Sequence, residues 1–444
     1  MTYSWFGPFK SKWKIVPLRE IARLGTGHTP SREVEAYWEN CTIPWVTVSD
    51  IRKHGASKLS PLRETEQKIS ELGLANSAAE LHPPGTVMLS RTASIGFSCV
   101  IDKPMATTQA FVTWTPGKKL DSNYLHATLK AMTQLFDSMA YGATHLTIYF
   151  PDIKTLRIPL PSLEEQTQIA RFLKHKTAKI DALIREQERL IELLQEKRQA
   201  VISHAVTKGL DPNVPMKDSG VEWLGEVPAH WEVRKVSYDF TAVKGPRGAI
   251  LTKEYCAANQ GPYPVYSGQT DNAGVLGSID DFDFSLGSNG GLLTTTVGAK
   301  AMSLNFVTKD ISLSQNCMLI RPISKQIFIK FYFYHLQPLF RLERAMIPDH
   351  MQPSFRMDDL YKFFVAQPPL KEQEAIALAL DVEMGRFDAL EREARLLIER
   401  LKERRSALIS AAVTGKIDVR NWQPPSDESA LDGSVRETGM ESTP

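Results

Sequence analysis

Short polar stretches between the apolar segments of this sequence carry the side chains that could contact another molecule. SDIRKHGASK (Ser49–Lys58) places four basic residues together, and LSRTASIG (Leu89–Gly96) surrounds one arginine with hydroxyl groups. Similar stretches follow at MATTQA (Met105–Ala110) and YGATHLT (Tyr141–Thr147). Arginine and lysine can hydrogen-bond to guanine, asparagine and glutamine to adenine, and hydroxyl groups to phosphate. These residue types therefore indicate a surface suited to nucleic acid.

A second set with the same chemistry lies in the other half of the chain. Its stretches are SGQTDNAG (Ser267–Gly274), TTTVGAKA (Thr294–Ala301), LSQN (Leu313–Asn316) and IPDHMQPS (Ile347–Ser354). The candidate contact residues of the first half are Arg52, Lys53, Ser90, Arg91, Thr92, Thr108, Gln109, Thr144 and His145. Those of the second half are Ser267, Gln269, Thr270, Asn272, Thr296, Lys300, Gln315, Asn316, His350 and Gln352. For any one of these residues, a solvent-exposed loop or turn is the simpler alternative.

No sequence motif of an enzyme accompanies these residues. The sequence has no [D/N]-P-P-[F/Y/W] loop of an amino-methyltransferase, no G-x-G-x-x-G after a predicted strand and no phosphate-binding P-loop. PDIK (Pro151–Lys154) lacks the acidic pair of a nuclease motif and is interpreted as the start of a strand. The four cysteines are scattered and the histidines form no H-x-x-x-H pair. We therefore expect a non-catalytic protein that binds no metal or cofactor itself.

Length and charge set broad limits on the protein. With 444 residues the chain can form two or three domains, each with its own core. The net charge of +2 permits nucleic-acid binding without requiring it. The first residues lack the apolar centre of a signal peptide, and no apolar run approaches the ~18 residues of a membrane span. Because scattered free thiols suit a reducing compartment, we expect a cytoplasmic protein.

Apolar runs between the polar stretches predict two blocks of similar plan. In the block at about residues 13–161, strands are predicted at Ile43–Ile51, Gly85–Ser90, Ser94–Ile101 and Ala110–Trp114, before a helix at Asn123–Ala140. In the block at about residues 231–369, strands are predicted at Tyr263–Gly268, Gly291–Gly298 and Asn316–Pro322, before a helix at Ile327–Glu343. An extended segment then closes each block. The sequence therefore predicts two α+β domains.

A long helical sequence occurs twice, about two hundred residues apart. DALIREQERLIELLQEKRQAVISHAVT (Asp181–Thr207) aligns without a gap with DALEREARLLIERLKERRSALISAAVT (Asp388–Thr414). Apolar residues step by three and four along both copies, which predicts a heptad seam that must be buried. The nearest partner for each copy is the other one. The predicted seam residues are Ile180, Leu183, Leu190, Leu194, Val201, Phe387, Leu390, Leu397, Leu401 and Leu408.

A weaker repeat precedes each block and helps to place the boundaries. WFGPFKSKW (Trp5–Trp13) aligns with WLGEVPAHW (Trp223–Trp231), and these tryptophans are predicted to pack between domain and helix. Ser162 and Glu165 fit a capping box, whereas Pro369 replaces the serine in the second copy. The predicted domains are residues 1–161 and 231–369, with helical regions at 162–209 and 370–418, a linker at 210–230 and a disordered tail at 419–444.

Four of these stretches together resemble the DNA-specificity (S) subunit of type I restriction-modification systems. They are MKDSGVEWLGEVPAHWEV (Met216–Val233), IPLPSLEEQTQIARFL (Ile158–Leu173), PPLKEQEAIALAL (Pro368–Leu380) and LIELLQEKRQAVISHAVTKG (Leu190–Gly209). The resemblance extends to about Arg420. It implies two target recognition domains, each reading one half of a bipartite, asymmetric site in double-stranded DNA. It also implies that the two helices pair as an antiparallel coiled coil, which sets the spacing between the half-sites.

The resemblance implies partners as well. Two methyltransferase (M) subunits would dock on the helices and restriction (R) subunits would join them, so that S-adenosylmethionine, Mg²⁺ and ATP belong to those partners. Recognition domains vary within this family, so none of its residues can be matched to the candidates above. The ~26 residues from Asp181 to Val206 would span ~39 Å, near the ~34 Å of one DNA turn. Three alternatives stay open: an orphan relative without a restriction role, a scaffold that never touches DNA, and a self-sufficient methyltransferase.

Overall fold

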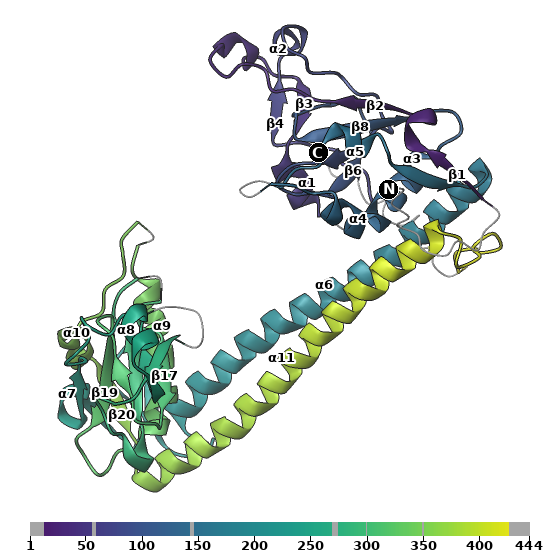
Figure 1. Ribbon diagram of the computed structural model, residues 1–444. Helices are drawn as coiled ribbons and strands as arrows, with labels where there is room; N and C mark the ends of the chain where they lie inside the picture. The colour runs from purple at the N-terminus through teal and green to yellow at the C-terminus, as the bar shows by residue number, and fades with distance from the viewer. Residues whose placement is uncertain are drawn as a thin grey trace, which may run out of the picture. The chain divides into compact units, whose positions relative to one another are not determined.

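The chain forms two compact units, each built from a domain and half of each long helix. The computed structural model describes residues 13–55, 59–142, 146–268, 274–298, 300–348 and 350–425. Unit 1 comprises Met1–Glu188 and Arg395–Pro444, and unit 2 comprises Arg189–Ala394. Both domains mix helices and sheets, and a long helix follows each sheet-containing segment in the sequence (Figure 1). The α+β fold class with two long helices is confirmed.

Two small sheets form the domain of unit 1. One has the order β2-β8-β5-β6, the other has the order β4-β3-β7, and β1 pairs with β9 where the chain enters and leaves the domain. The strands are β1 (Lys14–Pro17), β2 (Ala22–Thr26), β3 (Ile43–Val46), β4 (Gln67–Ile69), β5 (Val87–Ser90), β6 (Ser98–Val100), β7 (Ala106–Thr107), β8 (Phe111–Pro116) and β9 (Arg157–Leu160). The helices are α1 (Val48–His54), α2 (Glu71–Ala75), α3 (Ser122–Ala131), α4 (Thr133–Ser138) and α5 (Phe150–Ile153).

The domain of unit 2 repeats this topology strand for strand. Its sheets have the orders β13-β19-β16-β17 and β15-β14-β18, and β12 pairs with β20. The strands are β12 (Glu232–Lys235), β13 (Phe240–Val243), β14 (Gln260–Tyr266), β15 (Val275–Ile279), β16 (Gly291–Thr295), β17 (Leu304–Val307), β18 (Ser312–Leu313), β19 (Cys317–Pro322) and β20 (Phe364–Gln367). The helices are α7 (Val236–Asp239), α8 (Lys253–Ala258), α9 (Ile329–Ala345) and α10 (Met357–Lys362). A hairpin of β10 (Met216–Asp218) and β11 (Glu226–Pro228) precedes this domain.

The helices α6 (Leu163–Lys208) and α11 (Leu370–Val413) pair antiparallel within each unit. In unit 1, Arg405 near the end of α11 forms an ion pair with Asp181 of α6. In unit 2, the equivalent Arg198 near the end of α6 forms an ion pair with Asp388 of α11. The later part of one helix thus meets the earlier part of the other in both units. Within the described ranges, no helix combines the length and apolarity that crossing a membrane requires.

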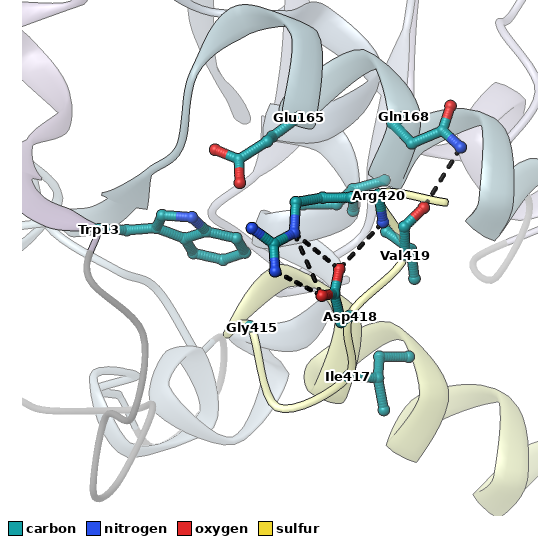
Figure 2. Close-up of a pocket in the computed structure, with 9 residues that line it drawn as sticks. Trp13, Glu165, Gln168, Gly415, Ile417, Asp418, Val419 and Arg420 are labelled. Atoms are coloured by element: carbon teal, nitrogen blue, oxygen red, sulfur yellow. Dashed lines mark hydrogen bonds and ion pairs between the residues drawn. The ribbon is translucent and has the colours of Figure 1, made fainter. Parts of the chain in front are cut away.

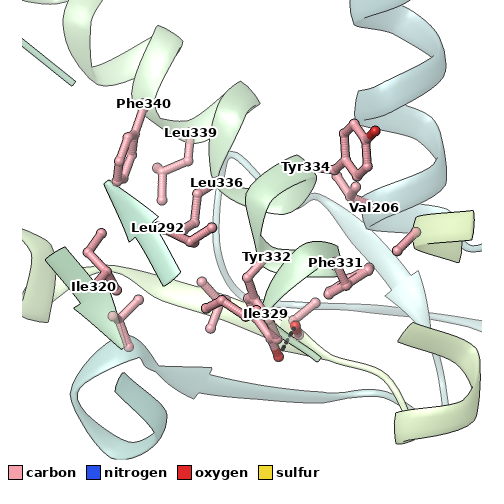
Figure 3. Packing of buried hydrophobic residues seen from close by; sticks show 14 of the residues in the cluster. Val206, Leu292, Ile320, Ile329, Phe331, Tyr332, Tyr334, Leu336, Leu339 and Phe340 are labelled. Atoms are coloured by element: carbon pink, nitrogen blue, oxygen red, sulfur yellow. Dashed lines mark hydrogen bonds between the residues drawn. The ribbon is translucent and has the colours of Figure 1, made fainter. Parts of the chain in front are cut away.

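The core of each domain continues into the helices. In unit 1, Leu173 of α6 and Val413 of α11 belong to the same buried cluster as Trp114 of β8. In unit 2, Val206 of α6 is fully buried and lies beside Tyr334 of α9 (Figure 3). Burial of apolar surface stabilises by roughly 25 cal/mol per Å², so each domain is attached to its helix segments by the same force that folds it.

A buried glutamine fastens the start of each long helix to its domain. Gln166 and Gln373 have no exposed surface, and each bonds three backbone groups. Gln166 accepts a hydrogen bond from the N–H of Asp121 (2.8 Å) and donates to the carbonyls of Lys119 and Pro161 (both 3.0 Å). Gln373 accepts from the N–H of Phe328 (2.8 Å) and donates to the carbonyls of Gln326 (3.0 Å) and Pro368 (2.8 Å). The two helices therefore begin in the same bonded frame.

Several predicted elements differ from the observed ones. The segment Ile43–Ile51 ends as a strand at Val46, and helix α1 begins at Val48 because Thr47 and Asp50 form a capping box. PDIK (Pro151–Lys154) lies in and after helix α5 and does not begin a strand, since Pro151 suits the first turn of a helix. The predicted helix at Asn123–Ala140 is two helices, α3 and α4, that meet near Met132. Residues 210–230 contain a hairpin.

The buried line along the helix pair differs from the predicted seam by one position in its middle. Ile180, Phe387 and Leu401 are buried, and Leu194, Val201 and Leu408 are half-buried. Leu183, Leu190, Leu390 and Leu397 are instead 40–48% exposed. Between Ile180 and Leu194, α6 has two adjacent lines of apolar residues. The structure buries Ile184 and Ile191 and leaves Leu183 and Leu190 exposed. In α11 the structure buries Ile398, the equivalent of Ile191, and also Ala394.

Candidate nucleic-acid interface

In unit 1 the turn after β5 meets the turn between β7 and β8. The Arg91 N–H donates to the carbonyl of Ala110 (2.9 Å), and the Arg91 Nε donates to the carbonyl of Gln109 (3.2 Å). The Arg91 guanidinium also lies 5.1 Å from the centre of the Phe150 ring. The structure therefore brings Ser90, Arg91, Thr92, Thr108 and Gln109 together. We call these five residues the recognition edge of unit 1. The equivalent recognition edge of unit 2, described below, contains Thr296, Gln315 and Asn316.

The side chain of Gln109 is exposed at the tip of the second turn. Thr29, in the loop after β2, donates its Oγ1 hydroxyl to Gln109 Oε1 (2.7 Å). This loop can lie so close because Gly27 has no Cβ; one there would sit 2.0 Å from the Thr107 carbonyl oxygen. Thr29 was not among the predicted residues. The stretch GTGHTP, with two glycines and a proline after a strand, is the signal that could have indicated a tightly packed loop.

The two basic candidates on α1 have different surroundings. The Arg52 Nε donates to the Ser94 Oγ (2.7 Å), which places Arg52 beside the turn that follows Arg91. Lys53 instead forms an ion pair with Glu66. The structure thus adds Arg52 to the recognition edge, while the charge of Lys53 is offset by its own partner. Both residues lie on a helix, and not on the loop that we predicted, because of the capping box at Thr47.

A third segment, after α4, completes the edge in unit 1. Thr144 and His145 lie outside the described residues, but their neighbours are bonded to the Arg91 turn. The Ala93 N–H donates to the Leu146 carbonyl (3.3 Å), and the Ile148 N–H donates to the Arg91 carbonyl (2.8 Å). Ala93 has a φ of +63°, which is unusual for a residue with a Cβ and allows the sharp turn.

Unit 2 repeats the hydrogen bonds of this edge with other residues. The Thr296 N–H donates to the Asn316 carbonyl (2.9 Å), as Arg91 donates to Ala110. The Phe355 N–H donates to the Thr296 carbonyl (2.7 Å), and the Gly298 N–H donates to the Pro353 carbonyl (3.0 Å). Thr296, Gln315 and Asn316 therefore gather at this edge, and Gln352 precedes the bonded Pro353.

The other candidates of unit 2 surround this arrangement. Ser267 precedes Gly268, where an added Cβ would lie 3.3 Å from the Cβ of Asn316, so the end of β14 packs on the same edge. The Ser303 N–H donates to the Lys300 carbonyl (2.9 Å) in the turn before β17. His350 is exposed. Gln269, Thr270 and Asn272 lie outside the described residues.

Arg247 marks where the two recognition edges differ most. It follows β13 in the loop equivalent to that of Thr29, and it was not among the predicted residues. Its guanidinium bonds Asp283 (2.6 Å) and Asp281 (2.7 Å). Burial disfavours the charged guanidinium, but the hydrogen bonds to Asp283 and Asp281 outweigh this and raise the pKa of Arg247. Its donors are therefore engaged within the domain.

A cavity of about 570 Å³ lies elsewhere in unit 1, where the start of α6 meets the segment after α11 (Figure 2). Its lining includes Trp13, Glu165 and Arg420 but none of the candidate contact residues. In unit 2, Trp231 at the position equivalent to Trp13 is fully buried, and its Nε1 donates to Glu372 Oε1 (3.0 Å). This confirms the predicted packing of Trp231 between domain and helix.

Comparison with known proteins agrees with this architecture. The family model described as the type I restriction modification DNA specificity domain matches residues 10–193 and again residues 228–400. The MjaIX specificity subunit of Methanocaldococcus jannaschii is 28% identical over 52% of this chain, which spans about half (52%) of that relative's length. The MjaVIII specificity subunit of the same organism is 23% identical over 92% of this chain and 94% of its own length.

Solved structures show the same fold. A chain from a structure described as the basis of complex assembly and conformational transition of the type I R-M system has a TM-score of 0.70 at 17% identity, over 92% of this chain and 100% of its own. The HsdS subunit from Thermoanaerobacter tengcongensis has a TM-score of 0.51 at 16% identity, over 93% of this chain and 99% of its own. Because the family model covers both domains and most of the chain, the chain belongs to the type I restriction-modification DNA specificity family.

Proposed function

We propose that this chain is the sequence-specific DNA-binding subunit of a type I restriction-modification complex, and that each domain reads one half of a bipartite, asymmetric site. The observation that carries the proposal is the recognition edge, which occurs twice on one backbone frame with different side chains. Arg91 and Thr296 hold equivalent places in that frame. Two readers with a common frame and different side chains suit a site with two different halves.

The helix pair suits the role of a spacer. Each unit contains an antiparallel pair of helix segments fixed by an arginine–aspartate ion pair, Asp181–Arg405 in unit 1 and Arg198–Asp388 in unit 2. Polar pairs at matching positions favour one register between two helices. A fixed register would give a fixed separation of the half-sites along the DNA.

The exposed leucines of the helices suit the docking of two methyltransferase subunits. Unit 1 carries Leu183 of α6 and Leu397 of α11, and unit 2 carries the equivalent pair Leu390 and Leu190. Large apolar side chains that are 40–48% exposed at repeated positions mark a surface for a protein partner. Two equivalent surfaces on one chain suit two copies of one partner. Restriction subunits would join this complex in the cytoplasm, and the partners would use S-adenosylmethionine, Mg²⁺ and ATP.

The first experiment is single-molecule sequencing of methylated bases in DNA from cells that express this chain together with its cognate methyltransferase. We expect a bipartite, adenine-methylated motif that requires both proteins. If no motif appears while the two proteins still co-purify, the chain is an orphan or a scaffold, which is the alternative function. Methyl transfer by the purified chain alone would instead revive the self-sufficient methyltransferase.

A second experiment tests the docking surface. The double variant L190D/L390D should lose one methyltransferase subunit and keep the other, and L183D/L397D should do the same on the other surface. Because these four residues are exposed, we expect the helical content in circular dichroism to stay unchanged. Mass measurement of the purified complex would count the bound subunits, and two subunits on both variants would contradict this surface.

A further inference from the structure

A glutamine occupies the same place on the recognition edge of both domains. Gln109 lies in the turn between β7 and β8, and Gln315 lies in the equivalent turn between β18 and β19. Both side chains are exposed. The neighbouring positions differ between the domains: Thr108 and Ala110 in one, Ser314 and Asn316 in the other. We propose that Gln109 and Gln315 bind the sugar–phosphate backbone of DNA at equivalent points of the two half-sites, an inference that rests on the proposed function.

The turn that carries Gln109 is held from three sides. The His28 N–H donates to the Thr107 carbonyl (3.0 Å), the Arg91 N–H donates to the Ala110 carbonyl (2.9 Å), and the Phe111 N–H donates to the Thr108 carbonyl (3.2 Å). The Arg91 Nε adds a bond to the carbonyl of Gln109 itself (3.2 Å). A side chain on such a rigid turn loses little backbone entropy when it binds a ligand.

The turn that carries Gln315 is held in the same way. The Thr296 N–H donates to the Asn316 carbonyl (2.9 Å), and the Ser314 N–H donates to the Tyr266 carbonyl (2.8 Å). The loop after β13 presses on the turn from the other side, because a Cβ on Gly248 would lie 3.1 Å from the Gln315 nitrogen. Both glutamines therefore project from pre-formed turns on equivalent frames.

The hydrogen bond from Thr29 orients the Gln109 side chain and favours its use as a donor. Bidentate reading of adenine in the major groove requires the Oε1 of glutamine as acceptor from N6 and its Nε2 as donor to N7. In this structure Oε1 already accepts from the Thr29 hydroxyl (2.7 Å). The side chain thus offers the two N–H donors of Nε2. Phosphate oxygens are acceptors only, and they are the commonest partners of protein donors on DNA.

The contrast with the neighbouring position supports a shared DNA feature. The two halves of an asymmetric site differ in their bases but have the same backbone. A residue that is identical in both readers suits the common feature, whereas Arg91 and Thr296 differ at one equivalent position. Arg91 also bonds the Gln109 carbonyl and lies over the Phe150 ring, so it helps to hold the turn that carries Gln109.

The test compares specific and non-specific DNA binding by the complex of this chain with its cognate methyltransferase. The variants are Q109A, Q315A and Q109E, with Q260A as the matched control, because Gln260 is an exposed glutamine at the far end of β14. Binding is measured by fluorescence anisotropy on a duplex with the methylated motif and on one with both half-sites scrambled. We expect Q109A and Q315A each to weaken both duplexes by the same factor, about tenfold.

The result for Q109E separates a phosphate contact from a simple surface effect. A carboxylate offers no donor and repels phosphate, so Q109E should weaken both duplexes more than Q109A does. The methylated motif should stay unchanged in every variant, and Q260A should bind as the wild type.

Three outcomes would overturn this inference. One is loss of binding to the specific duplex alone, the second is a changed base in one half-site, and the third is wild-type affinity in Q109A and Q315A. Thermal unfolding at the wild-type temperature would show that the variants are folded. If the wild-type complex itself fails to distinguish the two duplexes, then the proposed function fails, and that result is separate from these three.

Discussion

The two domains share a frame but fill it with different side chains at the places where they join the helices. In unit 1, the Tyr124 hydroxyl lies within hydrogen-bond distance of the Val413 carbonyl of α11 (3.3 Å) and of the Pro159 carbonyl (2.8 Å). In unit 2, the His335 Nδ1 bonds the equivalent carbonyl, that of Val206 in α6 (3.0 Å). A buried carbonyl near a helix end needs a donor, and either side chain supplies one. The shared fold therefore requires a hydrogen-bond donor beside this helix carbonyl, but the donor can be a tyrosine or a histidine.

The equivalent glutamates Glu165 and Glu372, at the starts of the two long helices, also have different bonding partners. Glu165 completes the capping box of α6 with Ser162, since its carboxylate accepts from the Ser162 N–H (3.1 Å). Glu372, where Pro369 replaces the serine, instead accepts hydrogen bonds from His230 (2.8 Å) and Trp231 (3.0 Å). Glu165 caps its own helix, whereas Glu372 ties the segment before β12 to the start of α11. Where one bond is lost in the repeat, the same side chain makes another.

The largest effect is expected when a buried isoleucine of the helix pair is shortened. This change tests whether the two units bury equivalent residues between α6 and α11. Ile398→Ala in unit 1 and Ile191→Ala in unit 2 should each lower the free energy of unfolding by about 2–4 kcal/mol, because each removes buried methyl groups. The neighbouring changes Leu397→Ala and Leu190→Ala, at exposed positions, should cost less than about 0.5 kcal/mol. Urea denaturation of the four variants gives the comparison. Equal losses at 397 and 398 would restore the heptad seam predicted from the sequence.

The next largest effect is expected when Gln166 or Gln373 is replaced. Equal losses of stability would show that the two glutamines hold their helix starts in the same way. Gln166→Ala and Gln373→Ala each leave buried backbone groups without a partner, which should cost about 2–3 kcal/mol in either unit. Chemical denaturation followed by tryptophan fluorescence measures both. A loss in one variant only would show that the two helix starts are held by different interactions.

A change of pH affects the two units differently, because the Tyr124 hydroxyl and the His335 imidazole titrate in different pH ranges. Burial lowers the pKa of His335 to about 3, below the ordinary value near 6.5. The unfolded chain therefore binds a proton at His335 that the folded chain excludes. Stability from this residue is complete above about pH 6.5 and falls by up to about 1.4 kcal/mol per pH unit as pH drops toward 3. Burial also lowers the pKa of His126 in unit 1 to about 3.

His335→Gln should therefore flatten the acid side of the stability profile without abolishing its slope, since His126 still titrates. Thermal unfolding of the wild type and this variant at pH 7.5, 6 and 5 would show the difference. An unchanged slope between pH 6 and pH 5 would remove His335 from this explanation. Tyr124→Phe, which removes the matching bond in unit 1, should shift stability equally at all three pH values.

The smallest effect concerns the two ion pairs of the coil. Asp181 and Arg405 are 18% and 13% exposed, whereas Asp388 and Arg198 are 55% and 26% exposed. Asp181→Asn should therefore cost about 1 kcal/mol or more, and Asp388→Asn only a few tenths, because exposed pairs are weakened by solvent. Denaturation at low and at high salt measures both. A larger loss of stability in Asp388→Asn than in Asp181→Asn would contradict the view that the Asp181–Arg405 ion pair is the stronger one.

Much of the fold could be predicted from the sequence because the chain repeats itself. The repeated helix, the strands Gly85–Ser90 and Asn316–Pro322 and the α+β plan are all confirmed. Only some of the candidate residues lie together at one edge of their domain: Ser90, Arg91, Thr92, Thr108 and Gln109 in unit 1, and Thr296, Gln315 and Asn316 in unit 2. That these residues contact DNA stays a prediction.

Other features depend on packing that local patterns do not contain. Leu190 and Ile191 are adjacent and both apolar, so periodicity alone could not choose which one faces the partner helix. The capping box at Thr47 outweighed the β-branched residues that favoured a longer strand. Gln166 and Gln373 lie within the repeated stretch LEEQ and LKEQ, which is a usable signal. Two of the three bonding partners of each glutamine, however, lie more than forty residues earlier in the chain.

The makeup of the two units has a consequence for the order in which the protein folds during synthesis. Unit 2 is one continuous stretch, Arg189–Ala394, so its core can close as soon as the ribosome has released that stretch. Unit 1 begins earlier in the chain, but its core includes Ile409, Ala412 and Val413 from α11. The domain that is translated first is therefore completed last, and until then its open helix-binding face is a surface that a chaperone or a partner would have to cover.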